Sequence, residues 1–412
     1  MQAGYPDGFV IASKPAVHFG VGAVGQLPAV VRAAGADHVV VVTDAVLAAT
    51  PVIATVMAVL ADAGLPARLF SGVHPNPTTV DIAAGAEAVA KSAAEAAAAA
   101  SASASAAAVT AMLKASAPSA GLAPAAARIA LVAVGGGSPM DAAKGIAIAG
   151  DFAVPALPIV AVPTTAGTGA ETSAFGVVTD PAAQRTVYVG HASSMPAAAI
   201  LDPALTAGLP PAATAATGMD ALTHALESYL SARPNPWSDG IALQVIRMVA
   251  ASLPRAYADG TNLAARSQML LAAHMAGVAM ANTGLGLCHA IGHSLGARWN
   301  IAHGVALAML LPETLRFNLL VRTERMADIA FALGAGDTSA DARRNAEAAI
   351  GAITVLRDEV GLHWLIGDFG ITEADFGQIA ADALDDEVLA GTPRPPTGDD
   401  IRAILLASSG GG

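Results

Sequence analysis

Hydrophobic residues in the first half of the chain occur in short β-branched runs, each followed by a turn and then by an amphipathic stretch. The clearest runs are residues 39–43, 129–134 and 159–162. Nearly continuous apolar runs are typical of strands buried on both faces, and their alternation with helical stretches predicts a parallel sheet. We therefore expect an α/β domain whose ligands bind at the carboxyl ends of the strands.

The pattern changes after about Pro210, where the β-branched runs stop. From Thr214 onward the chain consists of long segments rich in Ala, Leu and Met, broken by Pro and Gly. This pattern predicts helices. We expect an α/β domain over residues 1–205 and an all-helical domain over residues 206–412. A length of 412 residues agrees with two domains, because single cores stop growing near about 250–300 residues.

Residues 92–127 form a tract of Ala and Ser with almost no other side-chain information. Alanine favours a helix, whereas the serines and two prolines weaken that prediction. We expect a helix that continues into an exposed extension without a functional role.

Composition narrows the class of protein. Charged residues make up 13% of the chain and the net charge is −12, which argues against nucleic acids and anionic membrane surfaces as partners. We see no strongly apolar stretch of about twenty residues and no signal peptide at the N-terminus, and therefore expect no membrane span. The single cysteine, Cys288, excludes an internal disulfide. A cytoplasmic, soluble protein is expected.

Three of the ten histidines, His289, His293 and His303, fall in one short segment. His289 and His293 are four residues apart on an expected helix, and Asp220 and His224 have the same spacing, so each pair shares a helix face. One carboxylate and three imidazoles suit a divalent metal such as Fe²⁺ or Zn²⁺. Spacing alone leaves open that these residues are ordinary ion pairs or buried histidines.

Two Gly-rich or Thr-rich segments follow expected strands. The first, GGGS at residues 135–138, opens a helix, and the second, PTTAGTGAETS at residues 163–173, contains Thr164, Thr165 and Thr168. Glycines let a ligand approach the backbone, and a helix N-terminus favours an anion. Two such loops at neighbouring strand ends indicate an elongated ligand such as a dinucleotide; a tight strand-to-helix turn is the alternative.

A third segment, GVGAVG at residues 20–25, matches the dinucleotide pattern GxGxxG literally. We favour GGGS over it, because GGGS follows the better strand. Asp44 stands at the end of an expected strand, where a carboxylate can bond a ribose 2′-hydroxyl and repel a 2′-phosphate. This predicts NAD rather than NADP, with a helix N-cap as the alternative role for Asp44.

Several segments together resemble the iron-containing (group III) alcohol dehydrogenases. The similar motifs cover most of the chain apart from the Ala/Ser tract, and they include GGGSPMDAAK (135–144), PTTAGTGAE (163–171), GMDALTHALESY (218–229) and GLCHAIGHSLGARWNIAHG (286–304). The resemblance implies an α/β nucleotide-binding domain followed by a helical domain, an architecture like that of dehydroquinate synthase. It also implies a homo-oligomer, dimeric or larger.

The resemblance also assigns residues. It implies metal ligation by Asp220, His224, His289 and His303, with His293 near the metal. It implies cofactor contacts at Asp44, Asn76, Gly136, Gly137, Ser138, Asp141, Thr164, Thr165 and Thr168. Arg185 and Thr392 stand where family members often have Lys and Asn, which puts contacts at those two positions in doubt.

The expected activity is hydride transfer between a nicotinamide cofactor and a small alcohol or aldehyde, with the metal as Lewis acid. His293 is expected to carry a proton or, alternatively, to orient its neighbours. A metal-independent keto-acid reductase of the maleylacetate reductase type is a second possibility, although the retained Asp220 favours the metal-using branch. A metal-dependent hydrolase or a non-catalytic metal-binding protein would leave the Gly and Thr loops unused.

Overall fold

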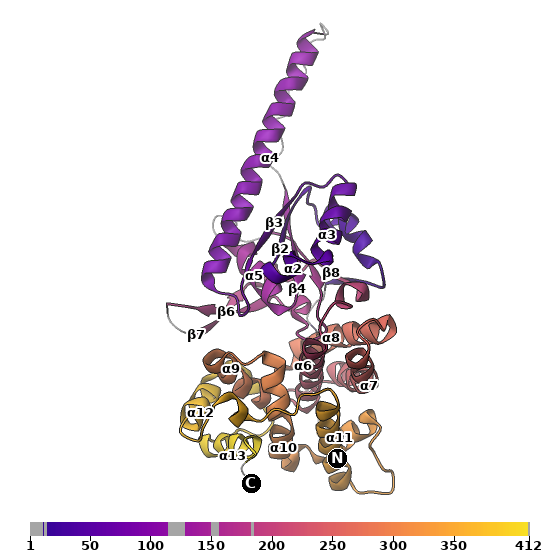
Figure 1. Cartoon of the computed structure of the whole chain (residues 1–412), viewed down its shortest axis with the longest axis vertical. Helices are drawn as coiled ribbons and strands as arrows, with labels where there is room; N and C mark the ends of the chain where they lie inside the picture. Colours follow the sequence, from indigo (N-terminus) through magenta and orange to yellow (C-terminus); the bar gives the residue numbers. More distant parts are fainter. Residues whose placement is uncertain (1–10, 12–14, 114–127, 150–155, 183–184, 411–412) are drawn as a thin grey trace. The chain divides into compact units, whose positions relative to one another are not determined.

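The computed structural model describes residues 11, 15–113, 128–149, 156–182 and 185–410. The chain divides into two compact units (Figure 1). The α/β unit comprises Pro15–Pro163 and Ala174–Asp202, and the helical unit comprises Thr164–Ser173 and the chain from Pro203 onward. The division thus lies at residue 202, close to the expected 205. It also assigns Thr164–Ser173 to the helical unit, although this segment was expected within residues 1–205.

The α/β unit is built on a six-stranded parallel sheet with the order β1-β8-β5-β4-β2-β3. Its strands are β1 (Ala16–Phe19), β2 (His38–Asp44), β3 (Ala67–Val73), β4 (Ile129–Gly135), β5 (Ile159–Pro163) and β8 (Ala198–Leu201). The three runs identified in the sequence are β2, β4 and β5, which lie side by side in the sheet. The predicted parallel α/β sheet is confirmed.

Helices cover both faces of this sheet. They are α1 (Leu27–Ala33), α2 (Ala45–Ala48), α3 (Pro51–Asp62), α4 (Thr79–Leu113) and α5 (Gly137–Ile148). Helices α4 and α5 pack together on one face, with α1 and α3 on the other (Figure 1). The four valines of β2, at residues 39–42, are fully buried, as expected of a strand covered on both sides. A separate hairpin, β6 (Phe175–Asp180) and β7 (Arg185–Gly190), packs on α5.

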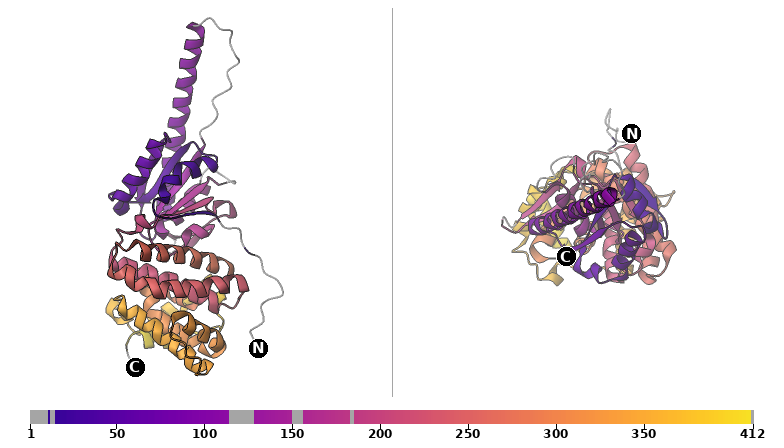
Figure 2. Two further views of the ribbon diagram at one scale, coloured as in Figure 1. Left: turned by 90° about the vertical axis from the view of Figure 1, so that its right-hand side faces the viewer. Right: turned by 90° about the horizontal axis from the view of Figure 1, so that it is seen from above.

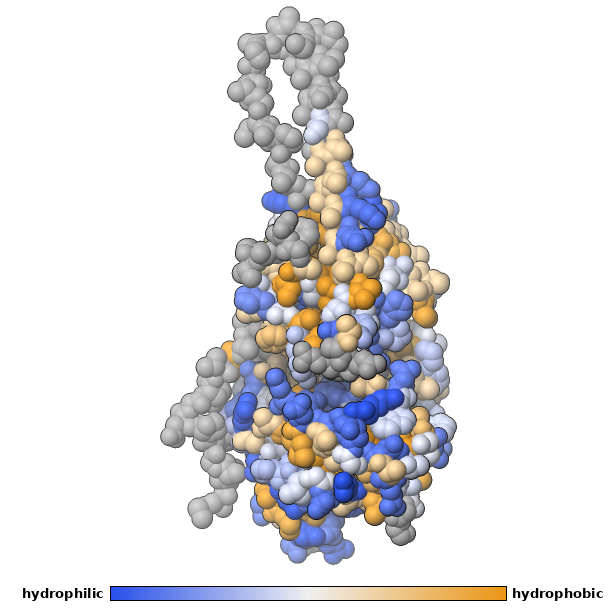
Figure 3. Space-filling model, turned by 90° about the vertical axis from the view of Figure 1, so that its left-hand side faces the viewer, coloured by the Kyte–Doolittle hydropathy of each residue, from blue (hydrophilic) through white to orange (hydrophobic). Residues whose placement is uncertain are grey.

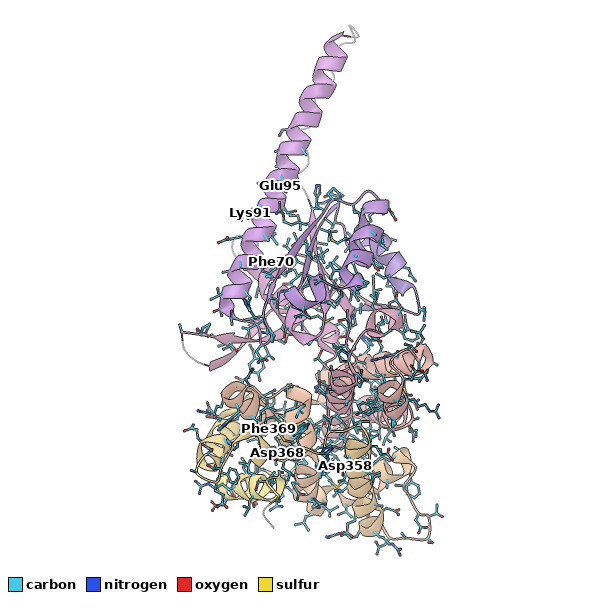
Figure 4. All side chains as sticks on the ribbon, viewed as in Figure 1. Phe70, Lys91, Glu95, Asp358, Asp368 and Phe369 are labelled. Atoms are coloured by element: carbon cyan, nitrogen blue, oxygen red, sulfur yellow. The ribbon has the colours of Figure 1, made fainter. Side chains whose placement is uncertain are left out.

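Helix α4 begins with a reciprocal cap. The amide of Thr78 donates to Asp81 Oδ2 at 2.9 Å, and the amide of Asp81 donates to Thr78 Oγ1 at 3.2 Å. Farther along, Glu95 of α4, which is labelled in Figure 4, forms an ion pair with Arg68 of β3. The helix then extends past the sheet (Figures 1 and 2) and ends at residue 113. It therefore contains residues 92–113 of the Ala/Ser tract, and residues 114–127 lie outside the described part of the chain.

The helical unit confirms the all-helical prediction for the second half. Its helices are α6 (Pro211–Leu230), α7 (Pro236–Ala258), α8 (Leu263–Thr283), α9 (Leu287–Trp299), α10 (His303–Leu333), α11 (Ala342–Glu359), α12 (Phe376–Asp385) and α13 (Gly398–Ser408). Helix α6 packs against α7, α8 and α10. Most of its residues from Thr214 to its end are buried, so its side chains are held firmly in place.

The carboxyl end of α6 is fixed by Arg322, where α10 bends. Arg322 has non-helical backbone angles (φ −134°, ψ 23°). Its guanidinium donates to the carbonyls of Leu230 and Ser231, each at 3.0 Å. Carbonyls at a helix end have no partner within the helix, so this arginine both satisfies them and joins α10 to α6.

Helix α10 is long and apolar enough to cross a membrane by length and composition. However, 72% of its most apolar window is buried inside the protein, as in the core helix of a globular domain. Helices α8 and α9 are long and apolar enough for a membrane span only when they are taken together, and the chain bends by 108° between them. The face shown in Figure 3 has hydrophilic residues interspersed among hydrophobic ones. The apolar character of α10 is therefore explained by its packing.

Candidate active site

Helix α6 places two polar side chains inside the helical unit. Asp220 and His224 are four residues apart and are only 2% and 4% exposed. The Nε2 atom of His224 lies 3.3 Å from Oδ1 of Asp220. Because burying a carboxylate without partners is costly, this pair requires further polar or cationic neighbours.

Helices α9 and α10 supply those neighbours. His289 lies in the first turn of α9, and His303 is the first residue of α10. Asn300 ends α9 with a left-handed backbone (φ 52°), which turns the chain toward the start of α10. There, a Cβ atom on Gly304 would lie 2.0 Å from the carbonyl oxygen of Ala216 in α6. Glycine at this position therefore lets His303 approach the site.

The three imidazoles converge on one carboxylate oxygen, Oδ1 of Asp220. The Nε2 atoms of His289 and His303 each lie 3.7 Å from Asp220 Oδ1. One ligand atom each from Asp220, His224 and His289 lies within 4.8 Å of the others. The rings of His224 and His289 stack at 4.7 Å between centroids, and His303 is 41% exposed at the edge of the cluster. The structure thus brings together the Asp and three His that were predicted from the sequence.

The carboxylates of the cluster favour a positive charge at His289, whereas burial, foremost, lowers the pKa of His303 to about 3. Burial raises the pKa of Asp220, but the neighbouring imidazoles, His224 foremost, outweigh burial and hold it well below the ordinary value. Burial lowers the pKa of His289, but the carboxylates of Glu227 and Asp220 outweigh it and raise the pKa to about 9. Burial dominates at His224, whose pKa is lowered. A cation among these groups is therefore stabilised by ionised carboxylates.

The cluster also contains polar atoms without a partner. Within the described part of the chain, neither Asp220 Oδ1 nor His289 Nε2 has a hydrogen-bond partner, and both atoms are buried. Buried polar atoms are nearly always satisfied in native proteins. Carboxylate oxygen and imidazole nitrogen are common ligands of Zn²⁺ and Fe²⁺. The residues present therefore fit a divalent transition metal.

Two carboxylates beside the cluster were missed by the sequence analysis. Glu227 Oε2 lies 2.6 Å from Nδ1 of His289, and Asp386 Oδ2 lies 2.7 Å from Nδ1 of His293. Glu227 could have been found, because it is seven residues after Asp220 and so lies on the same face of α6. Asp386 is 93 residues from His293, so no spacing within a short stretch of sequence indicates that these two residues are in contact.

The expected cofactor residues of the α/β unit follow the carboxyl ends of adjacent parallel strands. Asp44 ends β2, Asn76 comes shortly after β3, and the GGGS loop follows β4. Thr164 directly follows β5, whose last residue, Pro163, pairs with Gly135 of β4. In open parallel sheets this is the edge at which ligands bind.

The GGGS loop has the backbone that an anion cradle needs. Gly135 has φ +147°, and a Cβ atom there would lie 2.6 Å from Pro139 Cγ, so a side chain cannot be accommodated. Gly136 is the N-cap of α5 and provides no side-chain cap, which leaves the first amides of the helix for a ligand. Asp141, one turn into α5, is 3.2 Å from the ammonium of the buried Lys144, and burial raises its pKa.

The other Gly-rich match, GVGAVG, binds a carboxylate of the protein itself. The amides of Gly22 and Val24 donate to the two carboxylate oxygens of Asp202, each at 3.1 Å. These donors are therefore already used, which agrees with our preference for GGGS. Asp44 caps α2 by accepting the amide of Leu47 at 2.8 Å, the alternative role considered for it.

The Thr-rich loop is anchored in the helical unit. Thr164 is buried, and Thr165 and Thr168 are half-buried. Glu171, in the same loop, lies 3.0 Å from Nδ1 of His274 in α8, and both residues are buried. The loop that leaves β5 is therefore held by a buried pair that the sequence analysis did not identify.

Comparison with known families gives matches over nearly the whole chain. Residues 15–120 and 119–203 match the family model described as iron-containing alcohol dehydrogenase. Residues 214–409 match the model described as the C-terminal part of the Fe-containing alcohol dehydrogenase family. The two models meet near the division between the two units.

Individual relatives agree with these matches. The 1,3-propanediol dehydrogenase of Klebsiella pneumoniae is 37% identical over 84% of this chain and 84% of its own length. The NAD-dependent methanol dehydrogenase of Bacillus methanolicus is 33% identical over 95% of this chain and 97% of its own. A solved 1,3-propanediol oxidoreductase superimposes with a TM-score of 0.85 at 35% identity, covering 97% of this chain and 99% of that one.

Proposed function

This chain belongs to the iron-containing alcohol dehydrogenase family, and from that premise we propose that it interconverts a small alcohol and its aldehyde with NAD(H) and a divalent metal. Its activity as an alcohol–aldehyde oxidoreductase follows from the family. To this activity, the proposal adds which residues bind the metal and the nucleotide, which metal is bound, and which nucleotide is used. The names of its relatives, which include propanediol, methanol and lactaldehyde enzymes, favour a substrate of few carbons.

The observation that carries the proposal is the buried cluster on α6, α9 and α10. We assign Asp220, His224, His289 and His303 as the metal ligands, because three of them are buried with atoms facing one another and two of those atoms lack hydrogen bonds. Fe²⁺ is the first choice and Zn²⁺ the second. Such an ion, when bound, supplies a Lewis acid that polarises a carbonyl and lowers the pKa of an alcohol.

We assign the nucleotide to the strand ends of the α/β unit and the Thr loop. The amides of Gly136, Gly137 and Ser138 would receive the pyrophosphate at the start of α5. Asn76, Asp141, Thr164, Thr165 and Thr168 complete the expected contacts. Asp44 uses Oδ1 to cap α2, and its other carboxylate oxygen would accept a hydrogen bond from a ribose hydroxyl. Its negative charge would disfavour a 2′-phosphate. The nicotinamide ring, when bound, accepts or donates the hydride.

The protein's own groups would orient the reactants and move the proton. His293 lies one turn after His289, with ring centroids 6.0 Å apart, and its side chain is 21% exposed. It therefore reaches both the cluster and solvent, as a proton carrier must. We further propose a homo-oligomer, dimeric or larger, that resides in the cytoplasm.

The decisive experiment is elemental analysis of protein purified without chelator, with His289→Ala and Cys288→Ala beside the wild type. Cys288 is the neighbouring buried residue and is not among the proposed ligands. We expect about one equivalent of iron or zinc in the wild type and in Cys288→Ala, and loss of it in His289→Ala. NAD(H)-linked turnover of short alcohols should follow the metal. A wild type that binds no metal and is not activated by Fe²⁺ or Zn²⁺ would instead support a metal-independent keto-acid reductase.

A further inference from the structure

Glu227 joins the two helices that carry most of the cluster. It lies on α6, three residues after His224, and its carboxylate contacts the first turn of α9. We propose that Glu227 is a positioning residue for the metal: it holds His289 through Nδ1, so that Nε2 points to the ion. This inference rests on the proposed metal site, and it concerns how that site is built.

Both carboxylate oxygens of Glu227 contact the start of α9. Oε2 accepts from the amide of Gly286 at 2.8 Å and lies 2.6 Å from Nδ1 of His289. Oε1 accepts from the amide of Cys288 at 2.7 Å. The side chains of Glu227 and His289 are 11% and 1% exposed, so water competes little for these bonds. One largely buried carboxylate therefore contacts three nitrogen atoms at the start of α9.

This arrangement fixes which nitrogen of His289 is available. An imidazole that donates from Nδ1 presents the lone pair of Nε2 to a metal, and partners of this kind are known to tune ligand histidines. Here Nε2 faces Asp220 Oδ1 at 3.7 Å. His224 differs, because its hydrogen-bond neighbour outside the cluster is the backbone of Gly167. Among the proposed ligands of α6 and α9, a carboxylate at Nδ1 is found in the described part of the chain only at His289.

Glu227 also substitutes for the missing cap of α9. Gly286 is the N-cap residue and contributes no side-chain hydrogen bond, and the first amides of a helix need acceptors. A Cβ atom on Gly286 would lie 3.2 Å from Glu227 Oε1, so glycine permits the close approach. The same negative charge stabilises the helix N-terminus. A shift of α6 relative to α9 would therefore break the orienting bond and the cap together.

Glu227→Gln tests the proposal, because glutamine has the same shape but one acceptor oxygen for three donors. We expect its Zn²⁺ affinity, measured by competition with a chelator, to fall about 10- to 100-fold. Glu171→Gln is the matched control: Glu171 is a buried glutamate that contacts His274 Nδ1 at 3.0 Å, outside the cluster. Its Zn²⁺ affinity should stay at the wild-type value. Equal affinity in Glu227→Gln and wild type would overturn the proposal.

A double-mutant cycle separates positioning from simple support of the fold. The cycle uses a His289→Ala background, in which the other three proposed ligands bind Zn²⁺ only weakly, so that its residual affinity is measured at raised Zn²⁺ concentration. In this background Glu227→Gln should have no further effect on Zn²⁺ affinity, because the residue it acts through is gone. The same loss in both backgrounds would show a structural role only and would overturn the proposal.

A proton NMR signature needs no metal. The short bond from Nδ1 should give a strongly deshielded imidazole N–H proton that is absent from both His289→Ala and Glu227→Gln and kept in Glu171→Gln. If wild type binds no Zn²⁺, the proposed metal-dependent function is wrong, but this signal still tests whether Glu227 positions His289. A signal that persists in Glu227→Gln would contradict that positioning role.

Discussion

His293 and Asp386 form a half-buried pair, in which Nδ1 of the imidazole lies 2.7 Å from Oδ2 of the carboxylate. The imidazole rings of His293 and His303 are stacked, with centroids 5.5 Å apart. A carboxylate at Nδ1 favours the tautomer that carries its proton there, so Nε2 is the nitrogen that the proposed proton transfer would use.

Replacing His293 with alanine should lower kcat about 100-fold or more, because a positioned general acid–base group contributes about 10²–10⁴-fold. Bound metal should stay near one equivalent, since His293 is not among the proposed ligands. Asp386→Asn should cause a smaller loss of kcat, because the imidazole remains but its tautomer is no longer fixed. Steady-state kinetics and elemental analysis check both. Parallel loss of metal in His293→Ala would assign it a structural role.

Asp44→Asn should weaken the discrimination between NAD and NADP. Asparagine caps a helix about as well as aspartate, so α2 should keep its first turn while the negative charge is removed. We expect the ratio of kcat/KM for NAD to that for NADP to fall about tenfold, or about 1.4 kcal/mol. Thermal unfolding of the variant serves as the control for the cap. An unchanged ratio would place the ribose away from Asp44.

Removing the metal should destabilise the protein. An ion that binds only the folded state adds about 4 kcal/mol when its free concentration is about 1,000 times Kd. We therefore expect Tm, measured by calorimetry, to fall on treatment with a chelator and to recover with Zn²⁺. His289→Ala should show neither change. A Tm that responds equally in this variant would indicate that Zn²⁺ binds elsewhere.

Asp81 should contribute to stability in a pH-dependent way. Burial raises its pKa, but the amide of Thr78 and the imidazole of His74 outweigh burial, and the pKa is lowered below the ordinary 3.8. The stabilisation is therefore fully present above about pH 4 and is lost as the pH falls through the lowered folded-state value.

Asp81→Ala should cost about 1 kcal/mol at pH 7 through loss of the cap. The difference from wild type should shrink below pH 4, as measured by denaturant unfolding across this range. Asp62→Ala, at an exposed carboxylate that ends α3, should show little effect at either pH. A difference between Asp81→Ala and wild type that persists undiminished at pH 3 would rule out the carboxylate as its source.

Cys288 should report unfolding of the helical unit. Its thiol is buried, with Sγ 3.5 Å from the carbonyl oxygen of Leu307. Burial, followed by the charge of Glu227, raises its pKa well above the ordinary value. Because the thiolate is the reactive form, a disulfide reagent should modify the native protein only as fast as the thiol becomes exposed. Rapid modification under native conditions would contradict the packing of α9 described above.

Much of the fold was predictable because its signals are local. The valines of β2 and the apolar runs of β4 and β5 are each contained in fewer than ten residues, and the pairs Asp220–His224 and His289–His293 need only the helical repeat. Glu227 follows the same repeat and could have been included. These features depend on neighbours in sequence, which periodicity reads directly.

The remaining features depend on distant neighbours. GVGAVG has the spacing of a dinucleotide loop, yet its amides bind Asp202, about 180 residues away. His293 gains its partner from beyond α12, and His274 gains Glu171 from 103 residues earlier. Nothing in a sequence window encodes such pairs, because they arise from how the helices pack.

The segment Thr164–Ser173 gives the chain an unusual path. The backbone passes from the α/β unit into the helical unit after Pro163, returns at Ala174, and leaves again after Asp202. Each unit is therefore formed from segments that are separated in the sequence. A fragment that begins at Pro203 would lack Glu171 and leave the buried His274 without this contact, so we expect the helical unit to be less stable when it is produced by itself. During synthesis, moreover, this short loop is made well before α8, so Glu171 can contact His274 only after α8 has also been synthesised.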